Sequence, residues 1–337
     1  MGLSFSTTWR VGGYANAAVP RRADPASLQQ LGGQTMGTTW SLRFDNPQML
    51  PLAQMREAVE AALTRVIAQM SHWEPDSLIS RFNAAPAGSR HALPAEFARV
   101  MQCALAWAQA SGGAIDPTVG ALVARWGFGP AASQDNTLPS PDALAVIHSN
   151  VGWQRLTFDE SDHTLLQPGG VQLDLSGIAK GFAVDHGVDA LRALGLTDLL
   201  LEIGGELRGI GRRPGGAPWQ VQVDTEMPLP QRIALADMAV ATSGDRWHRR
   251  ALEGRSWSHT IDPRDGEPVA HALASVTVLH PQCMQADALA TVLTVLGPDE
   301  GLAFAQQRDV AALFISRADD GSLTERATRA WQAQAGA

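Results

Sequence analysis

The sequence predicts a mixed α/β protein of the α+β kind, and three observations lead to this fold class. Amphipathic segments with the 3.6-residue period of a helix and short apolar runs of strand type follow one another without strict β-α-β alternation. The chain has 337 residues, of which 45% are hydrophobic and 18% charged, an ordinary globular composition. No stretch approaches the roughly 18 uninterrupted apolar residues of a membrane span, so we expect no transmembrane segment.

The N-terminal half begins with a strand, TWSLRF, at residues 39–44. An amphipathic helix over 54–70 follows, because its apolar residues recur on one stripe. Asp76 is the expected N-cap of a short helix after it. A second amphipathic helix spans 94–113 and ends at a Gly-Gly pair. Residues 129–146, rich in proline, serine and asparagine, are the best candidate for a linker or surface insertion.

The C-terminal half intermixes strands and helices. In order, these are a strand at 171–175 (VQLDL), a helix at 177–195, a strand at 199–205, a strand at 275–280, a helix at 284–297 and a strand at 310–316. For the whole chain we expect a flexible N-terminal lead-in at residues 1–30, a single domain at 31–320 and a C-terminal tail at 321–337.

The net charge and the cysteine content argue against a nucleic-acid partner and against a disulfide framework or zinc site. The net charge of -8 argues against a nucleic-acid partner, because phosphate contacts require clustered lysine and arginine. The two cysteines, Cys103 and Cys283, lie in apolar surroundings without CxxC spacing. We therefore expect buried free thiols and neither a disulfide framework nor a zinc site.

The helix at 284–297 contains two polar residues, Asp287 and Thr291, among alanine and leucine. They are four residues apart and therefore share a face, and two oxygen ligands one turn apart suit a hard cation. A purely structural interpretation stays open: a carboxylate near a helix start complements the helix dipole, and threonine can bond back to the preceding turn.

Two further motifs could carry chemistry. In LDLSGIAKG, Asp174 ends an apolar run and a Ser-Gly turn opens the helix that carries Lys180, which could form an anion seat. The alternative is an N-cap serine with a surface lysine. In SHTIDPRDG, His259 stands three residues before Asp262, a pairing suited to base catalysis. The alternative is an Asp-Pro turn beside a solvated histidine.

Taken together and in order, eight motifs resemble the ApbE family, the FAD:protein FMN transferases. They are QTMGTTWSLRF, MSHWEPDSLISRFN, GGAIDPTVGALVARWGFGP, LDLSGIAKGFAVD, LLEIGGELRGIG, AVATSGD, SHTIDPRDGEPV and QADALATVLTVLG. The resemblance covers roughly residues 34–316. It implies a single FAD-binding domain of the ApbE type with a T-fold-like core.

The resemblance also implies an activity. Proteins of this family use Mg²⁺ to transfer the FMN moiety of FAD to a Ser or Thr hydroxyl of a target flavoprotein, which forms a phosphoester-linked flavin and releases AMP. Two other functions stay open: an FAD pyrophosphatase that converts FAD to FMN and AMP, and a non-catalytic FAD-binding protein.

The family pattern assigns roles to individual residues. His259 is our candidate base for the acceptor hydroxyl, because an imidazole can ordinarily take up a proton near neutral pH. FAD would contact Met36, Trp73, Ala114, Ile115, Asp116, Asp174, Lys180 and Ile261. Mg²⁺ would take the backbone carbonyl of Gly177 and the side-chain oxygens of Asp287 and Thr291.

Localisation departs from the family pattern. Many relatives are exported lipoproteins, whereas the first residues here show neither a secretory signal nor a lipobox cysteine. As the sequence stands we expect a cytoplasmic protein. A trimmed or miscalled N-terminus would fit a periplasmic, membrane-associated one.

Overall fold

The structure, a computed structural model, describes residues 28–133, 137–223, 231–245 and 249–335. The helices are α1 (Leu52–Met70), α2 (Leu78–Asn83), α3 (Ala95–Ala110), α4 (Gly120–Arg125), α5 (Pro141–His148), α6 (Ala179–Ala193), α7 (Cys283–Gln307) and α8 (Arg329–Ala335), with one 3-10 turn, η1 (Trp153–Arg155). The strands are β1 (Gln29–Thr35), β2 (Thr38–Phe44), β3 (Arg90–Ala92), β4 (Thr157–Asp159), β5 (Thr164–Leu166), β6 (Leu199–Ile203), β7 (Glu206–Ile210), β8 (Trp219–Val223), β9 (Gln231–Leu235), β10 (Met238–Gly244), β11 (Arg249–Leu252), β12 (Arg255–Ser258), β13 (Leu273–His280), β14 (Ala311–Arg317) and β15 (Leu323–Ala327).

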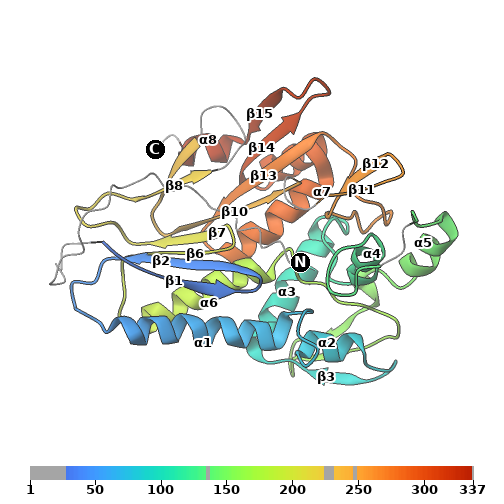
Figure 1. The fold of residues 1–337 in the computed structure, drawn as a ribbon, viewed down its shortest axis with the longest axis horizontal. Coiled ribbons are helices and arrows are strands. Elements are labelled where there is room, and N and C mark those ends of the chain that lie inside the picture. The colour runs from blue at the N-terminus through green and yellow to red at the C-terminus, as the bar shows by residue number, and fades with distance from the viewer. Residues whose placement is uncertain (1–27, 134–136, 224–230, 246–248, 336–337) are drawn as a thin grey trace.

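The framework is an eight-stranded sheet in the order β1-β2-β6-β7-β10-β13-β14-β15, with helices packed against it (Figure 1). All neighbouring strands in it are antiparallel, so the mixed α/β prediction of the α+β kind is confirmed. Helices α6 and α7 pack against each other and against the sheet, and α1 packs on α6.

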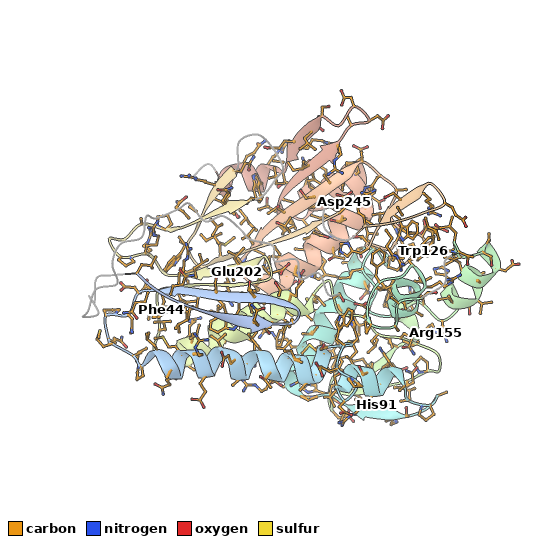
Figure 2. All side chains as sticks on the ribbon, in the orientation of Figure 1. Phe44, His91, Trp126, Arg155, Glu202 and Asp245 are labelled. Atoms are coloured by element: carbon orange, nitrogen blue, oxygen red, sulfur yellow. The ribbon has the colours of Figure 1, made fainter. Side chains whose placement is uncertain are left out.

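Apolar side chains on both faces of the sheet are buried, because successive residues of a strand point to opposite faces. In β6, Leu199 and Leu201 join the large core formed with the helices. Leu200 instead joins a second core with Trp219 of the β8–β9 hairpin and Trp331 of α8. Figure 2 labels Phe44 of the large core, whose side chain is fully buried.

A smaller core supports one side of the cavity described below. Trp126, labelled in Figure 2, packs edge to face on Trp257 of β12, with ring centroids 5.6 Å apart. Leu122 of α4, Leu144 of α5 and Ile261 complete its buried centre. This core therefore fixes the loop that follows β12.

Several local predictions are wrong, and each has a physical reason. The segment 171–175 alternates buried and half-buried residues but has only an isolated bridge, Val119 to Gln172, so it is not a strand. The N-cap of α2 is Ser77, which accepts a hydrogen bond from the Ser80 amide, and not Asp76.

Other differences concern the ends of elements. The expected linker 129–146 lies partly outside the described residues, and its last part begins α5, capped by Ser140. The expected lead-in also lies outside them up to residue 27, and β1 begins at Gln29. The expected tail, 321–337, contains β15 and α8, and β15 pairs with β14.

Helix α7 is the central helix of the fold. Among the described residues it is the one helix long and apolar enough to cross a membrane. However, 61% of its apolar stretch is buried inside the protein, as expected of a core helix. Both cysteines are buried free thiols, as predicted. α7 is kinked at Gly297 (φ 82°), where the predicted helix ends, and Pro298 follows.

Candidate functional site

A cavity of about 60 Å³ lies where the loop before α4, the loop before α6, the loop after β12 and α7 meet. Seven of the predicted site residues line it: Ala114, Ile115, Asp116, Asp174, Gly177, Ile261 and Thr291. A water needs roughly 10–15 Å³ of such volume, so the space suits a hydrated cation or a phosphate group and not a whole dinucleotide. Any larger ligand would extend out of this cavity over the surface.

The proposed metal ligands come from two segments that face each other. Thr291 Oγ1 donates to the Gly177 carbonyl oxygen across 3.4 Å, and Asp287 lies one turn earlier on α7. A Cβ at Gly177 would lie 2.7 Å from Thr291 Oγ1, so only glycine fits here without displacing the hydroxyl. This places a carbonyl and a hydroxyl within reach of one cation.

Asp287 is held by the start of α6. Its Oδ2 accepts a hydrogen bond from the Gly181 amide at 2.8 Å, and a Cβ at Gly181 would lie 2.7 Å from the Asp287 Cβ. α7 begins at Cys283, so Asp287 is in its second turn and does not serve the helix dipole at the N-terminus. The alternative interpretation, in which Asp287 complements the helix dipole, is therefore wrong.

Asp287, Lys180 and Glu206 form a cluster of charges. Lys180 Nζ lies 2.6 Å from Glu206 Oε1, and its side chain is 39% exposed. Burial, and next the Glu206 carboxylate, raise the pKa of Asp287 to about 7, although Lys180 and the Gly181 amide act in the opposite direction. Burial alone would lower the pKa of Lys180, but Glu206 and Asp287 raise it above its usual value.

The loop at Asp174 differs from the capped helix that the sequence allowed. Asp174 Oδ1 accepts a hydrogen bond from the Ser176 amide at 2.7 Å, and the N-cap of α6 is Ile178, without a side-chain cap. The interpretation as an N-cap serine with a surface lysine is therefore wrong. Asp174 and Gly177 instead lie together at the cavity.

Asp116 lines the cavity and also forms hydrogen bonds that connect two loop segments. Its Oδ1 accepts hydrogen bonds from the Thr118 amide and hydroxyl, and its Oδ2 accepts one from the Trp153 amide. Burial raises the pKa of Asp116, while these hydrogen bonds oppose the rise. The carboxylate thus ties the 116–118 turn to η1.

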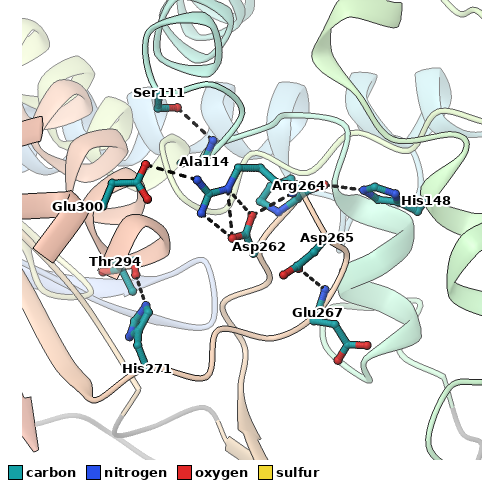
Figure 3. A network of polar contacts seen from close by, with 11 residues as sticks. Ser111, Ala114, His148, Asp262, Arg264, Asp265, Glu267, His271, Thr294 and Glu300 are labelled. Atoms are coloured by element: carbon teal, nitrogen blue, oxygen red, sulfur yellow. Dashed lines mark hydrogen bonds and ion pairs between the residues drawn. The ribbon is translucent and has the colours of Figure 1, made fainter. Parts of the chain in front are cut away.

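His259 follows β12 and stands edge to face with Phe128, with ring centroids 6.2 Å apart. The Asp262 carboxylate is bound by the Arg264 guanidinium, which also faces Glu300 at 3.7 Å (Figure 3). Asp262 Oδ1 also accepts from the Arg264 amide, which is an Asx turn. The turn interpretation therefore accounts for Asp262.

Three predicted FAD contacts, Met36, Trp73 and Lys180, are not among the residues that line the cavity. Met36 and Gly37 form the two-residue turn between β1 and β2, both with positive φ (47° and 70°). A methionine in this conformation is uncommon, and such outliers cluster at functional sites. The Trp73 side chain is 65% exposed, which leaves its ring available for stacking.

Sequence reasoning missed two buried carboxylates. Glu206 is 2% exposed and Asp185 is 1% exposed. Asp185 accepts hydrogen bonds from the Cys283 and Met284 amides, both at 3.0 Å, and pairs with Arg208 at 2.8 Å. In the sequence, Glu206 stands out only as the acidic residue after the Gly-Gly pair in EIGGELRG, which by itself indicates no role.

No group of three or more His, Cys, Asp and Glu side chains in the described ranges could hold a metal ion. A cation here would therefore depend on one carboxylate, on neutral oxygens and on oxygens from its substrate or water. Mg²⁺ commonly binds in this way, since it keeps several waters and substrate phosphates.

Comparisons with known proteins agree on one family. The model of the ApbE family matches residues 36–314. A Haemophilus influenzae protein named FAD:protein FMN transferase is 37% identical over 306 residues, 88% of each chain, and one from Vibrio cholerae is 35% identical over 302 residues, 88% of this chain and 90% of that protein. The crystal structure of the Pseudomonas stutzeri flavinyl transferase ApbE in its apo form has a TM-score of 0.85 at 35% identity and covers 92% of this chain and 98% of that one.

Proposed function

The chain belongs to the ApbE family, and on that premise we propose how its site carries out flavin transfer. The protein is an enzyme that transfers the FMN part of FAD to a target protein. Our proposal concerns the metal, the acceptor group and the residues that act. The observation that carries it is the convergence of Asp174, Gly177, Ile261 and Thr291 on one cavity beside Asp287.

We propose Mg²⁺ as the metal, bound by the Gly177 carbonyl, the Asp287 carboxylate and the Thr291 hydroxyl. These donors are hard oxygens from the cavity wall and from α7, and Thr291 Oγ1 lies 3.4 Å from the Gly177 oxygen. When bound, Mg²⁺ would offset the charge on the pyrophosphate and on departing AMP. The Gly181 amide donates a hydrogen bond to Asp287 Oδ2 and so holds the carboxylate that would bind the cation.

The acceptor is a Ser or Thr hydroxyl of a target flavoprotein. A new bond forms between its oxygen and the phosphorus of the FMN half, and the phosphorus–oxygen bond to AMP breaks. AMP leaves with the bridging oxygen. The hydroxyl proton passes to the imidazole of His259, since a hydroxyl is a weak nucleophile until a base removes its proton.

The remaining predicted contacts hold FAD in place. Met36 at the hairpin tip and the exposed Trp73 ring would contact its ring systems, as methionine and aromatic faces suit stacked rings. The segment Ala114–Asp116 with Ile261 would line the nucleotide, and Asp174 would accept hydrogen bonds from it. Lys180 would lie near the phosphates as a point charge.

The test is a transfer assay with FAD, Mg²⁺ and two peptides of a flavoprotein, one with the acceptor threonine and one with valine in its place. We expect AMP release and a mass gain equal to FMN on the threonine peptide only, both lost with EDTA. Free FMN with neither peptide modified would support the pyrophosphatase instead. FAD binding without AMP release would support a non-catalytic FAD-binding protein.

A further inference from the structure

Glu206 is a buried carboxylate with an incomplete set of partners. It begins β7 and is 2% exposed. Its Oε1 accepts from Lys180 Nζ at 2.6 Å. Its Oε2 is buried and accepts no hydrogen bond from any residue of the described ranges. Buried carboxylates are costly unless well paired, so its position next to this site requires a reason.

Lys180 is close enough to two carboxylates, those of Glu206 and Asp287, for both to raise its pKa. It is adjacent to Gly181, whose amide binds Asp287, so the chain holds Lys180 and Asp287 close together. The charge of Lys180 acts on the pKa of Asp287, yet within the described residues the ion pair of Lys180 is with Glu206 and none joins it to Asp287. The ammonium is thus drawn to one of two available anions.

This choice matters because an ammonium and a metal cation compete for the same carboxylate. A Lys180 side chain bound to Asp287 would neutralise it and repel a cation at the same oxygen. Its long, flexible stem can reach more than one partner. A second carboxylate that holds the ammonium removes this competition.

We propose that Glu206 is a positioning residue that holds Lys180 away from Asp287 and so leaves the Asp287 carboxylate to the cation. The inference rests on the proposed function of the site. Glu206 touches neither the cation nor FAD in this account, and it acts through Lys180.

The decisive variant is Glu206→Gln, which keeps the size of the side chain and removes its charge. The matched control is Glu202→Gln. Glu202 lies on the same hairpin and is half-buried, but its carboxylate accepts from Ser41 Oγ and the Gly205 amide. Both variants remove one negative charge from the hairpin, and only one of them releases Lys180.

Mn²⁺ binding to the full-length protein, followed by electron paramagnetic resonance, gives the readout. We expect E206Q to weaken Mn²⁺ binding about tenfold or more, as for other residues that orient metal ligands. The double variant K180M/E206Q should restore binding to within about twofold of wild type, since no ammonium is left to occupy Asp287. E202Q should stay within about the same twofold margin.

Thermal unfolding verifies that each variant is folded. Should E206Q not fold, K180M alone decides: it should bind Mn²⁺ at least as tightly as wild type, and weaker binding would overturn the inference. Unchanged binding in E206Q, or no recovery in K180M/E206Q, would overturn it as well. A wild-type protein that binds no Mn²⁺ would instead refute the proposed cation site, a separate outcome.

Discussion

Replacement of Asp287 by asparagine should stabilise the metal-free protein while it abolishes its response to metal. The asparagine side chain has nearly the same volume, and its carbonyl oxygen can still accept from the Gly181 amide, which now binds Asp287 at 2.8 Å. What disappears is a charge that is buried close to Glu206. The proposed function therefore requires a buried charge that destabilises the protein when no metal is bound.

The size of the effect follows from the pKa of Asp287. Its carboxyl has a pKa of about 7 in the folded protein and 3.8 as the ordinary value. Each pKa unit corresponds to about 1.4 kcal/mol, so the charged form costs the folded state up to about 4 kcal/mol. Because the folded pKa is the higher one, stability present below pH ~3.8 is lost as the pH rises to ~7, and the loss then levels off.

The assay is thermal or urea unfolding of wild type and D287N at pH ~5 and ~8, with EDTA or with Mg²⁺. In EDTA the advantage of D287N should grow with pH and reach at most about 4 kcal/mol. Mg²⁺ at a hundred times its dissociation constant should add about 2.7 kcal/mol to wild type and nothing to D287N. The reasoning would be refuted if D287N were less stable than wild type by the same amount at both pH values. It would also be refuted if Mg²⁺ stabilised D287N as much as wild type.

Three further predictions concern the loop, the base and the helix anchor. Gly177→Ala should weaken Mn²⁺ binding about tenfold with the fold retained, since the new Cβ would lie 2.7 Å from Thr291 Oγ1; unchanged binding would contradict the assigned ligands. His259→Gln should slow transfer, followed by mass spectrometry, about 100-fold or more while FAD and Mn²⁺ still bind; a normal rate would exclude it as the base. Asp185→Asn should lower the urea-derived free energy of unfolding by about 3 kcal/mol, because it leaves Arg208 without its buried counter-charge; a change below about 1 kcal/mol would show that the amide caps suffice.

The period of apolar residues predicts burial better than it predicts pairing. Val171, Leu173 and Leu175 alternate as in a strand, and all three are buried. Yet the Leu173 amide and carbonyl bind the side chain of Asn83, at 2.7 and 2.9 Å, in place of a neighbouring strand. A side chain distant in sequence thus supplies the hydrogen bonds of a missing strand, and no local pattern contains that information.

In the candidate site too, some residues are recognisable from the local sequence and others only from tertiary contacts. Asp287 and Thr291 could be found because two polar residues on an apolar helix stand out. Glu206 could not be given a role, because an acidic residue at the start of a strand is unremarkable until the fold brings Lys180 within 2.6 Å. The order of the motifs identifies the segments that form the site. Which charged side chains pair with one another depends on tertiary contacts, which the sequence does not show.

The segment of α7 that carries Asp287 and Thr291 is anchored at both ends. At its start, the Asp185 carboxylate accepts from the first two amides of the helix. At its end, Pro298 has no amide hydrogen to bind the carbonyl of Thr294, four residues earlier. His271 Nε2 lies 2.7 Å from that carbonyl and donates to it (Figure 3). His271 belongs to the loop between β12 and β13, which also carries His259.

These two anchors connect the parts of the site mechanically. Any shift of α7 along its axis must break either the Asp185 cap or the His271 contact, and both partners are parts of other elements. Rotation of Thr291 away from Gly177 is limited by the same two points. The proposed cation ligands are thereby fixed before substrate binds. This matters for a site with so few protein oxygens, because precise geometry must compensate for the small number of ligands.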